Sequence, residues 1–152
     1  MTYLLYAVLA AGAGACIALQ ASANSKFRTN LGGPGFAAVL SICGTFLTAG
    51  VGFLVYWVVA RPPVPTAETL RETQWWNWIG GPLGALIVLA GATLTRDLGA
   101  AVFIALVVGG QLVCSMLLDH FALMGLSEQP LTPGRALGAV LVVAGVVCIK
   151  YL

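Results

Sequence analysis

Uncharged polar residues recur at helical spacing in two apolar stretches of the sequence. Gln20 and Asn24 stand four residues apart in the first stretch, and Gln111 and Ser115 do the same in a later one. Residues at this spacing share one face of a helix. The two faces could line a shared cavity that binds the polar group of a small substrate, or they could form hydrogen bonds between helices. Both interpretations stay open for Gln20 and Gln111.

Asp119, His120 and Arg135 form a second group of residues with possible chemistry. Asp119 precedes an expected helix end at Gly125, where the helix dipole disfavours a carboxylate, so it should have a basic partner. Arg135 lies across a short loop, and a histidine such as His120 changes its charge near neutral pH. We consider two roles for Asp119: a functional group that binds and releases a proton, or a structural ion pair with Arg135, since acids in apolar segments commonly pair.

Tryptophans cluster at the start of the third apolar stretch, where Trp75 and Trp78 follow a polar loop. Their rings could hold a cationic substrate by cation–π contact. Alternatively, they anchor the chain at the membrane–water interface, where tryptophan is enriched.

The residues required for enzyme chemistry are missing. The chain has one histidine, no phosphate loop, no nucleophile elbow and no paired carboxylates at helical spacing inside an apolar stretch. Four cysteines lie in apolar runs without a CxxC spacing, so we expect small buried packing residues and no metal or other cofactor. They are Cys16, Cys43, Cys114 and Cys148. The net charge of +2 is too small and dispersed for a nucleic-acid surface.

The composition determines which elements must position these residues. Of the 152 residues, 60% are hydrophobic and 8% charged, against about 45–50% and 25% in soluble domains. A bilayer core of about 30 Å needs about 20 helical residues. This length predicts a single all-α membrane domain with five transmembrane helices, at about residues 3–23, 36–60, 75–94, 98–119 and 135–152.

Local signals set the ends of these spans. The first should end before the polar stretch that starts at Asn24, and the second at Arg61, before two prolines that cannot continue a helix. Residues 95–97 form a tight loop in this interpretation, so the third and fourth spans are antiparallel neighbours. Thr132 and Pro133 suit the start of the last helix.

Small residues repeat on helix faces, as in Gly80-x-x-x-Gly84 and Gly134-x-x-x-Gly138. Such faces let membrane helices approach closely. We expect them to make helix contacts within one subunit, with a dimer contact as the alternative.

An odd number of spans puts the termini on opposite sides of the membrane. The basic residues then divide almost equally between the sides: Arg61, Arg71 and Arg135 on one, and Lys26, Arg28, Arg96 and Lys150 on the other. Since the Lys/Arg bias sets orientation, a balance this close would let the chain insert either way round. Two opposite copies would form an inverted-repeat pair. A single orientation with Lys26 inside the cell is the alternative.

Several fragments in a fixed order carry a family resemblance across nearly the whole chain. They are residues 19–24, 78–85, 98–103, 110–112, 119–121 with Gly125, and 135–138. Together they resemble the short, five-helix YdcZ-like inner membrane exporters of bacteria, in the drug/metabolite transporter superfamily. The resemblance implies a multi-pass protein of the bacterial inner membrane that exports small metabolites or toxic organic compounds. It also implies larger relatives with two halves of opposite topology fused into ten helices.

The chain departs from the related four-helix multidrug exporters, which carry an acid in the first helix. Here the first helix has Gln20 in place of an acid, so the resemblance does not imply proton-coupled cation antiport for this chain.

These observations lead to one main hypothesis and one alternative. The chain is expected to be half of a ten-helix inverted-repeat transporter, assembled as an antiparallel homodimer or as a heterodimer with a related five-helix chain. Spans one, three and four of each copy would line a cavity for a small-molecule substrate. The alternative is a non-transporting membrane subunit or scaffold that stabilises a larger partner.

Overall fold

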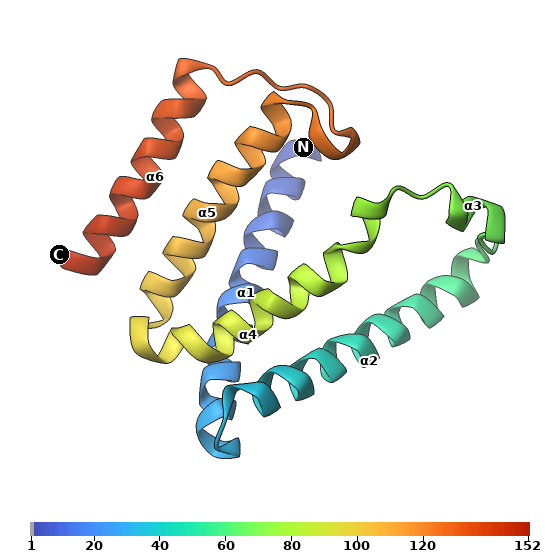
Figure 1. Ribbon diagram of the computed structural model, residues 1–152, viewed down its shortest axis with the longest axis horizontal. Helices are drawn as coiled ribbons and strands as arrows, with labels where there is room; N and C mark the ends of the chain where they lie inside the picture. Colours follow the sequence, from blue (N-terminus) through green and yellow to red (C-terminus); the bar gives the residue numbers. More distant parts are fainter. Residues whose placement is uncertain (1) are drawn as a thin grey trace. The chain divides into compact units, whose positions relative to one another are not determined.

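The computed structural model describes Thr2–Leu152 and consists of helices and their connections, with no strand among those residues (Figure 1). Its elements are α1 (Thr2–Leu31), α2 (Pro34–Ala60), α3 (Ala67–Arg71), η1 (Trp75–Trp78), α4 (Gly80–Leu98), α5 (Ala100–His120), η2 (Leu123–Gly125) and α6 (Pro133–Tyr151). Five segments are long and apolar enough to cross a membrane: α1, α2, η1 with α4, α5 and α6. This confirms the predicted number of spans.

The chain divides into two compact units, which are described separately. One unit contains the chain up to Ala18 together with Leu94–Leu152, and the other contains Leu19–Thr93.

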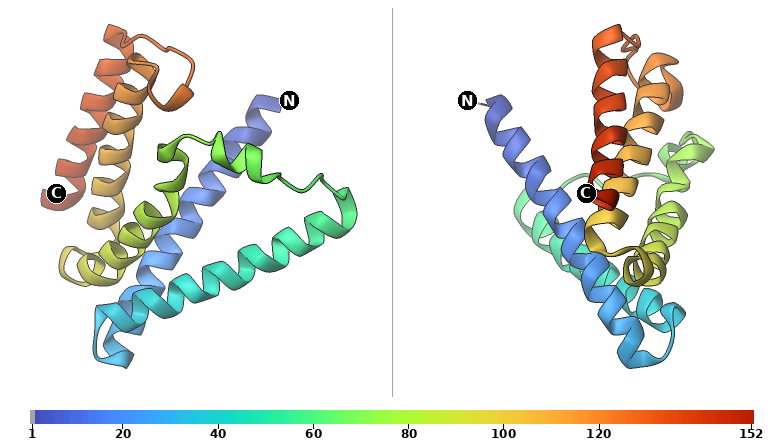
Figure 2. Two further views of the ribbon diagram at one scale, coloured as in Figure 1. Left: turned by 45° about the vertical axis from the view of Figure 1, so that its right-hand side comes forward. Right: turned by 90° about the vertical axis from the view of Figure 1, so that its left-hand side faces the viewer.

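The first unit contains a hairpin of α5 and α6, which run side by side in opposite directions (Figures 1 and 2). Close packing occurs at Gly109, where an added Cβ would lie 3.9 Å from Cγ2 of Val146. The predicted start of the last helix is confirmed, because the Thr132 hydroxyl accepts a hydrogen bond from the Arg135 amide at 3.3 Å and Pro133 opens α6. The cap satisfies an amide that the helix itself cannot bond.

The second unit contains the end of α1, all of α2 and most of α4. Pro34 opens α2, two residues before the expected start at residue 36. Arg61 ends the helix before the two prolines, as the sequence predicted, and adopts a left-handed conformation. The Arg28 side chain connects α1 to α4, since its Nη1 donates to the Thr93 carbonyl at 2.6 Å.

Two helices extend beyond the expected spans. The first helix does not end near residue 23 but continues to Leu31, and the expected loop at residues 95–97 is part of α4. Polar side chains do not terminate a helix when its backbone is hydrogen-bonded, whereas a glycine with positive φ does. The stops are Gly32 and Gly99, with φ values of 74° and 82°.

Small side chains make up much of the buried set. Only Ala37 and Ala38 are buried in α2, although this helix has 27 residues. The expectation of buried cysteines is wrong, because all four are exposed in the isolated chain. A cysteine can face outwards in this chain because its thiol is as compatible with lipid as with a protein interior.

Candidate functional site

A cavity of about 440 Å³ lies within the second unit, between the second half of α1, the middle of α2 and the first half of α4. This volume falls within the range of small-molecule sites. Its lining is Gln20 from α1, Ile42, Thr45 and Phe46 from α2, and Gly80, Gly81, Gly84, Ala85, Ile87 and Val88 from α4. The cavity is therefore mostly apolar and partly open, and its wall can contact the apolar part of an organic molecule.

Missing side chains create part of this space. A Cβ added at Gly80, Gly81 or Gly84 would meet no atom within 4 Å. The same holds at Gly138. The expectation that the Gly80/Gly84 face makes close helix contacts is not met within the described chain, since these glycines border open space.

Gln20 is the polar group of the cavity that is available to a ligand. The other polar side chain, Thr45, donates its hydroxyl to the Ser41 carbonyl at 3.0 Å and is thus satisfied by its own helix. Among residues 2–152 no protein group hydrogen-bonds the Gln20 side chain. An amide provides two donors and an acceptor, so Gln20 can bind either kind of polar ligand atom.

Asn24 lies one turn beyond Gln20 and is 5% exposed. Its Nδ2 has no hydrogen-bond partner. A buried amide without a partner costs about 1–3 kcal/mol. Asn24 is therefore a donor for which a ligand, a water molecule or a second chain would supply the acceptor. It does not line the cavity that contains Gln20.

The loop between α5 and α6 holds the group that contains Asp119 and Arg135. Nη2 of Arg135 lies 2.6 Å from Oδ2 of Asp119, and Nη1 donates to the Gln129 carbonyl at 2.6 Å. The Gln129 amide in turn donates to the Asp119 carbonyl at 2.9 Å. One arginine thus joins the end of α5, the loop and the start of α6. The structure therefore shows an ion pair between Asp119 and Arg135. A role of Asp119 in proton coupling stays a prediction.

His120 stabilises the same loop at a different point. Its Nδ1 accepts a hydrogen bond from the Leu131 amide at 3.2 Å. Its ring lies edge-on to that of Phe121, with centroids 4.7 Å apart. This geometry requires an unprotonated Nδ1, because a protonated nitrogen cannot accept.

The other residues singled out from the sequence lie elsewhere. Gln111 and Ser115 are exposed on α5, and the Ser115 hydroxyl donates to the Leu112 carbonyl at 2.9 Å. Trp75 and Trp78 are 70% and 61% exposed in η1, where an interfacial belt is expected. Neither tryptophan lines the cavity, and their binding role stays a prediction.

Sequence reasoning did not include α2 in the cavity. Thr45 and Phe46 contribute to its lining, but neither belongs to a polar stripe or a motif. The glycines of α4 did carry a signal, because Gly80-Gly81 with Gly84 concentrates residues without side chains at one helix start. That signal indicates close approach of another group, and the structure shows that no helix of the described chain fills this space.

Comparisons with known proteins extend this description. The family described as "Putative inner membrane exporter, YdcZ" matches residues 5–148. The "Inner membrane protein YdcZ" of Escherichia coli (strain K12) is 36% identical over 78 residues, which cover 51% of this chain and 52% of that protein. The aligned part therefore spans about half the length of this curated relative. No solved structure matches the chain.

Proposed function

Because the chain belongs to the YdcZ family of inner membrane exporters, we propose that it is a secondary carrier for small organic molecules. It is a multi-pass inner membrane protein, with five helices of sufficient length and apolarity to cross a bilayer. The observation that supports carriage most directly is the cavity of about 440 Å³, which has the free amide of Gln20 in its wall. The chain acts as a carrier and not as an enzyme in this proposal.

The lining indicates the chemistry of the substrate. Apolar side chains and bare glycine backbone surround most of the space, and the cavity lining includes no charged residue. Binding an ion here would require desolvation without a counter-charge. The substrate is therefore a small metabolite or toxic compound with a large apolar part and at least one hydrogen-bonding group.

Transport by alternating access would use two copies of the chain in opposite orientations. The odd number of helices and the nearly equal division of Lys and Arg support this arrangement. The exposed apolar surface of α2 supports it as well, because few of its residues are buried in a single chain. A related five-helix chain could replace the second copy.

Flux in proteoliposomes tests the proposal. Gln20→Leu keeps the side-chain volume and removes the hydrogen-bonding group, so efflux of a recognised compound should fall at least tenfold while the protein stays folded. Thr48→Val is the matched control, because its hydroxyl bonds to the Gly44 carbonyl of its own helix and it does not line the cavity. Gln111→Leu tests the second polar stripe in the same assay. Unchanged efflux in Gln20→Leu would remove this residue from the site.

Labelling of tagged termini tests the assembly. Dual orientation predicts that each terminus is accessible from both sides of the membrane in a population of cells. A uniform orientation would contradict the antiparallel homodimer. Silence over a broad panel of compounds, with stoichiometric co-purification of an unrelated membrane protein, would favour the scaffold.

A further inference from the structure

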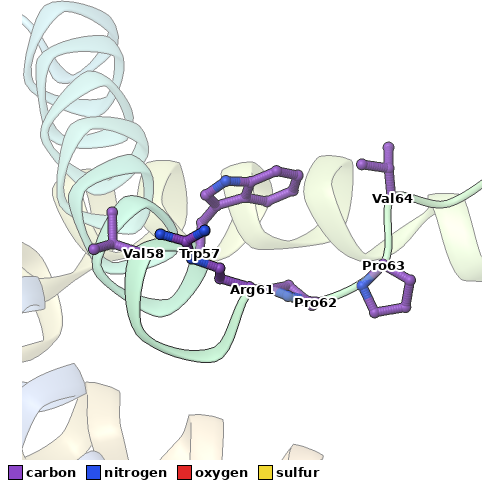
Figure 3. Close-up of a pocket in the computed structure, with 6 residues that line it drawn as sticks. All are labelled: Trp57, Val58, Arg61, Pro62, Pro63 and Val64. Carbon is purple, nitrogen blue, oxygen red and sulfur yellow. The ribbon is translucent and has the colours of Figure 1, made fainter.

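A second cavity, unrelated to the one that contains Gln20, lies at the end of α2 within the same unit. It has a volume of about 580 Å³ and is lined by six consecutive or nearly consecutive residues: Trp57, Val58, Arg61, Pro62, Pro63 and Val64. Figure 3 shows the Arg61 guanidinium folded back towards Trp57 and Val58, with the two prolines leading away from it. The cavity thus combines one cation with an indole and several apolar groups.

The conformation of Arg61 is unusual for its residue type. Arg61 has φ of 44° and ψ of 54°, and its amide donates to the Trp57 carbonyl at 3.0 Å. Glycine or asparagine is the common choice for such a left-handed helix end, because a Cβ is unfavourable there. The cation is favourable at a helix C-terminus and offsets part of this cost, while its guanidinium stays available to another group.

Arg61 also differs from two other arginines in its contacts. Arg28 donates to the Thr93 carbonyl, and Arg135 is paired with Asp119. Within the described part of the chain, no hydrogen bond or ion pair forms at the Arg61 guanidinium. An arginine has five N–H donors in a planar fork that matches phosphate and carboxylate, and here all of them are available.

The length of α2 places this cavity in the headgroup layer of the membrane. Its 27 residues span about 40 Å, which exceeds the hydrocarbon core of about 30 Å and approaches the full bilayer of about 40–45 Å. Arg61 directly follows the last residue of the helix, and Trp57 lies one turn earlier, at the depth where indoles are enriched. The anion most abundant at this depth is the phosphate of a phospholipid.

We propose that the cavity formed by Trp57, Arg61 and Pro62–Val64 binds the headgroup of an anionic phospholipid. The Arg61 guanidinium donates to the phosphate, and the acyl chain lies along Val58 and the apolar side chains of α2. The helix end carries a partial negative charge that disfavours anions, so the arginine supplies the attraction. A free phosphate has the same anionic group but no apolar part, and would leave the valine and proline surface of the cavity uncovered.

Native mass spectrometry of the full chain in detergent tests this site. Dioleoyl phosphatidylglycerol and dioleoyl phosphatidylcholine are added in equal amounts, and the ratio of bound lipids is measured. Arg61→Asn removes the charge with a residue that tolerates the left-handed conformation, and should lower the preference for phosphatidylglycerol about fivefold, the effect of one interfacial basic residue. Arg61→Lys should retain most of the preference. Arg71→Asn is the control, since it makes the same charge change in the same connection.

Three results would overturn the proposal. The first is an unchanged lipid ratio in Arg61→Asn. The second is an equal loss in Arg61→Asn and Arg71→Asn, which would show an effect of net charge and not of this cavity. The third is displacement of phosphatidylglycerol by millimolar inorganic phosphate, which would show a site for a free anion. Circular dichroism of each variant verifies that the helices are intact, and Trp57→Ala provides an independent change in the cavity wall that should also reduce the preference.

Discussion

The hairpin of α5 and α6 and the helices of the second unit are built from similar residues but are held in different ways. In the hairpin, Arg135 bonds to Asp119 and to the Gln129 carbonyl, and His120 bonds to the Leu131 amide. In the second unit, α2 buries only two alanines, and the glycines at the start of α4 border a cavity.

This difference suggests a division of roles between the two regions. Charge-assisted hydrogen bonds fix the direction in which α6 leaves the loop, so the hairpin should move as one rigid element. Both units border open space, since a hollow of about 570 Å³ lies between α5 and α6, but only the cavity of the second unit has a free amide, that of Gln20, in its wall. In the proposed carrier these two regions would have different roles, because a site can change its access only if some helices move while others keep their packing.

Filling the cavity should give the largest effect. Gly84→Leu places a side chain in space where an added Cβ meets nothing within 4 Å, so it should abolish transport without disturbing the fold. Gly50→Leu is the matched control: it makes the same change in α2, also meets no atom within 4 Å, and does not line the cavity. Efflux from proteoliposomes measures the result. Equal transport by both variants would show that the second unit has no functional cavity.

Removing the ion pair between Asp119 and Arg135 should have a smaller effect, and this effect should be on stability. Asp119→Asn or Arg135→Gln replaces a charge-assisted bond of 2.6 Å between side chains that are 30% and 34% exposed. We expect a loss of about 1–2 kcal/mol in the free energy of unfolding, less than for a fully buried pair. Denaturant unfolding in mixed micelles would measure it. The double variant should lose less than the sum of the single variants; strict additivity would mean that the two side chains do not interact.

Changing His120 should give the smallest effect. His120→Leu removes the acceptor for the Leu131 amide and should cost about 1 kcal/mol in stability. His120→Asn keeps a side-chain acceptor of similar reach and should recover part of this loss. Hydrogen exchange at the Leu131 amide reports the bond directly, and faster exchange in His120→Leu alone is the expected outcome. Identical protection in both variants and in the parent chain would show that the loop is held without His120.

Features governed by local chemistry could be predicted from the sequence. The five apolar spans, the end of α2 before Pro62 and the start of α6 at Pro133 all follow from chain length in a bilayer and from proline and capping rules. The Asp119–Arg135 contact could be anticipated because a carboxylate near a helix end requires a cation.

Features that depend on tertiary arrangement could not be predicted. Thr45 and Phe46 contribute to the cavity because residues of α1 and α4 line the same space, which no periodicity encodes. The extension of α1 to Leu31 was missed for another reason: hydropathy reports where lipid ends, whereas the helix ends where Gly32 adopts a positive φ. The same distinction applies to α4 and Gly99.

The transmembrane helices differ in length, so a change in bilayer thickness affects them unequally. The 19 residues of α6 reach about 28 Å and the 27 residues of α2, which is apolar along its length, about 40 Å. In a thicker bilayer α2 can stand more upright, whereas α6 has no spare turn and the surrounding lipid must thin to match it. Hydrophobic mismatch is therefore concentrated at α6, and acyl-chain length becomes a variable that can weaken the hairpin without any mutation.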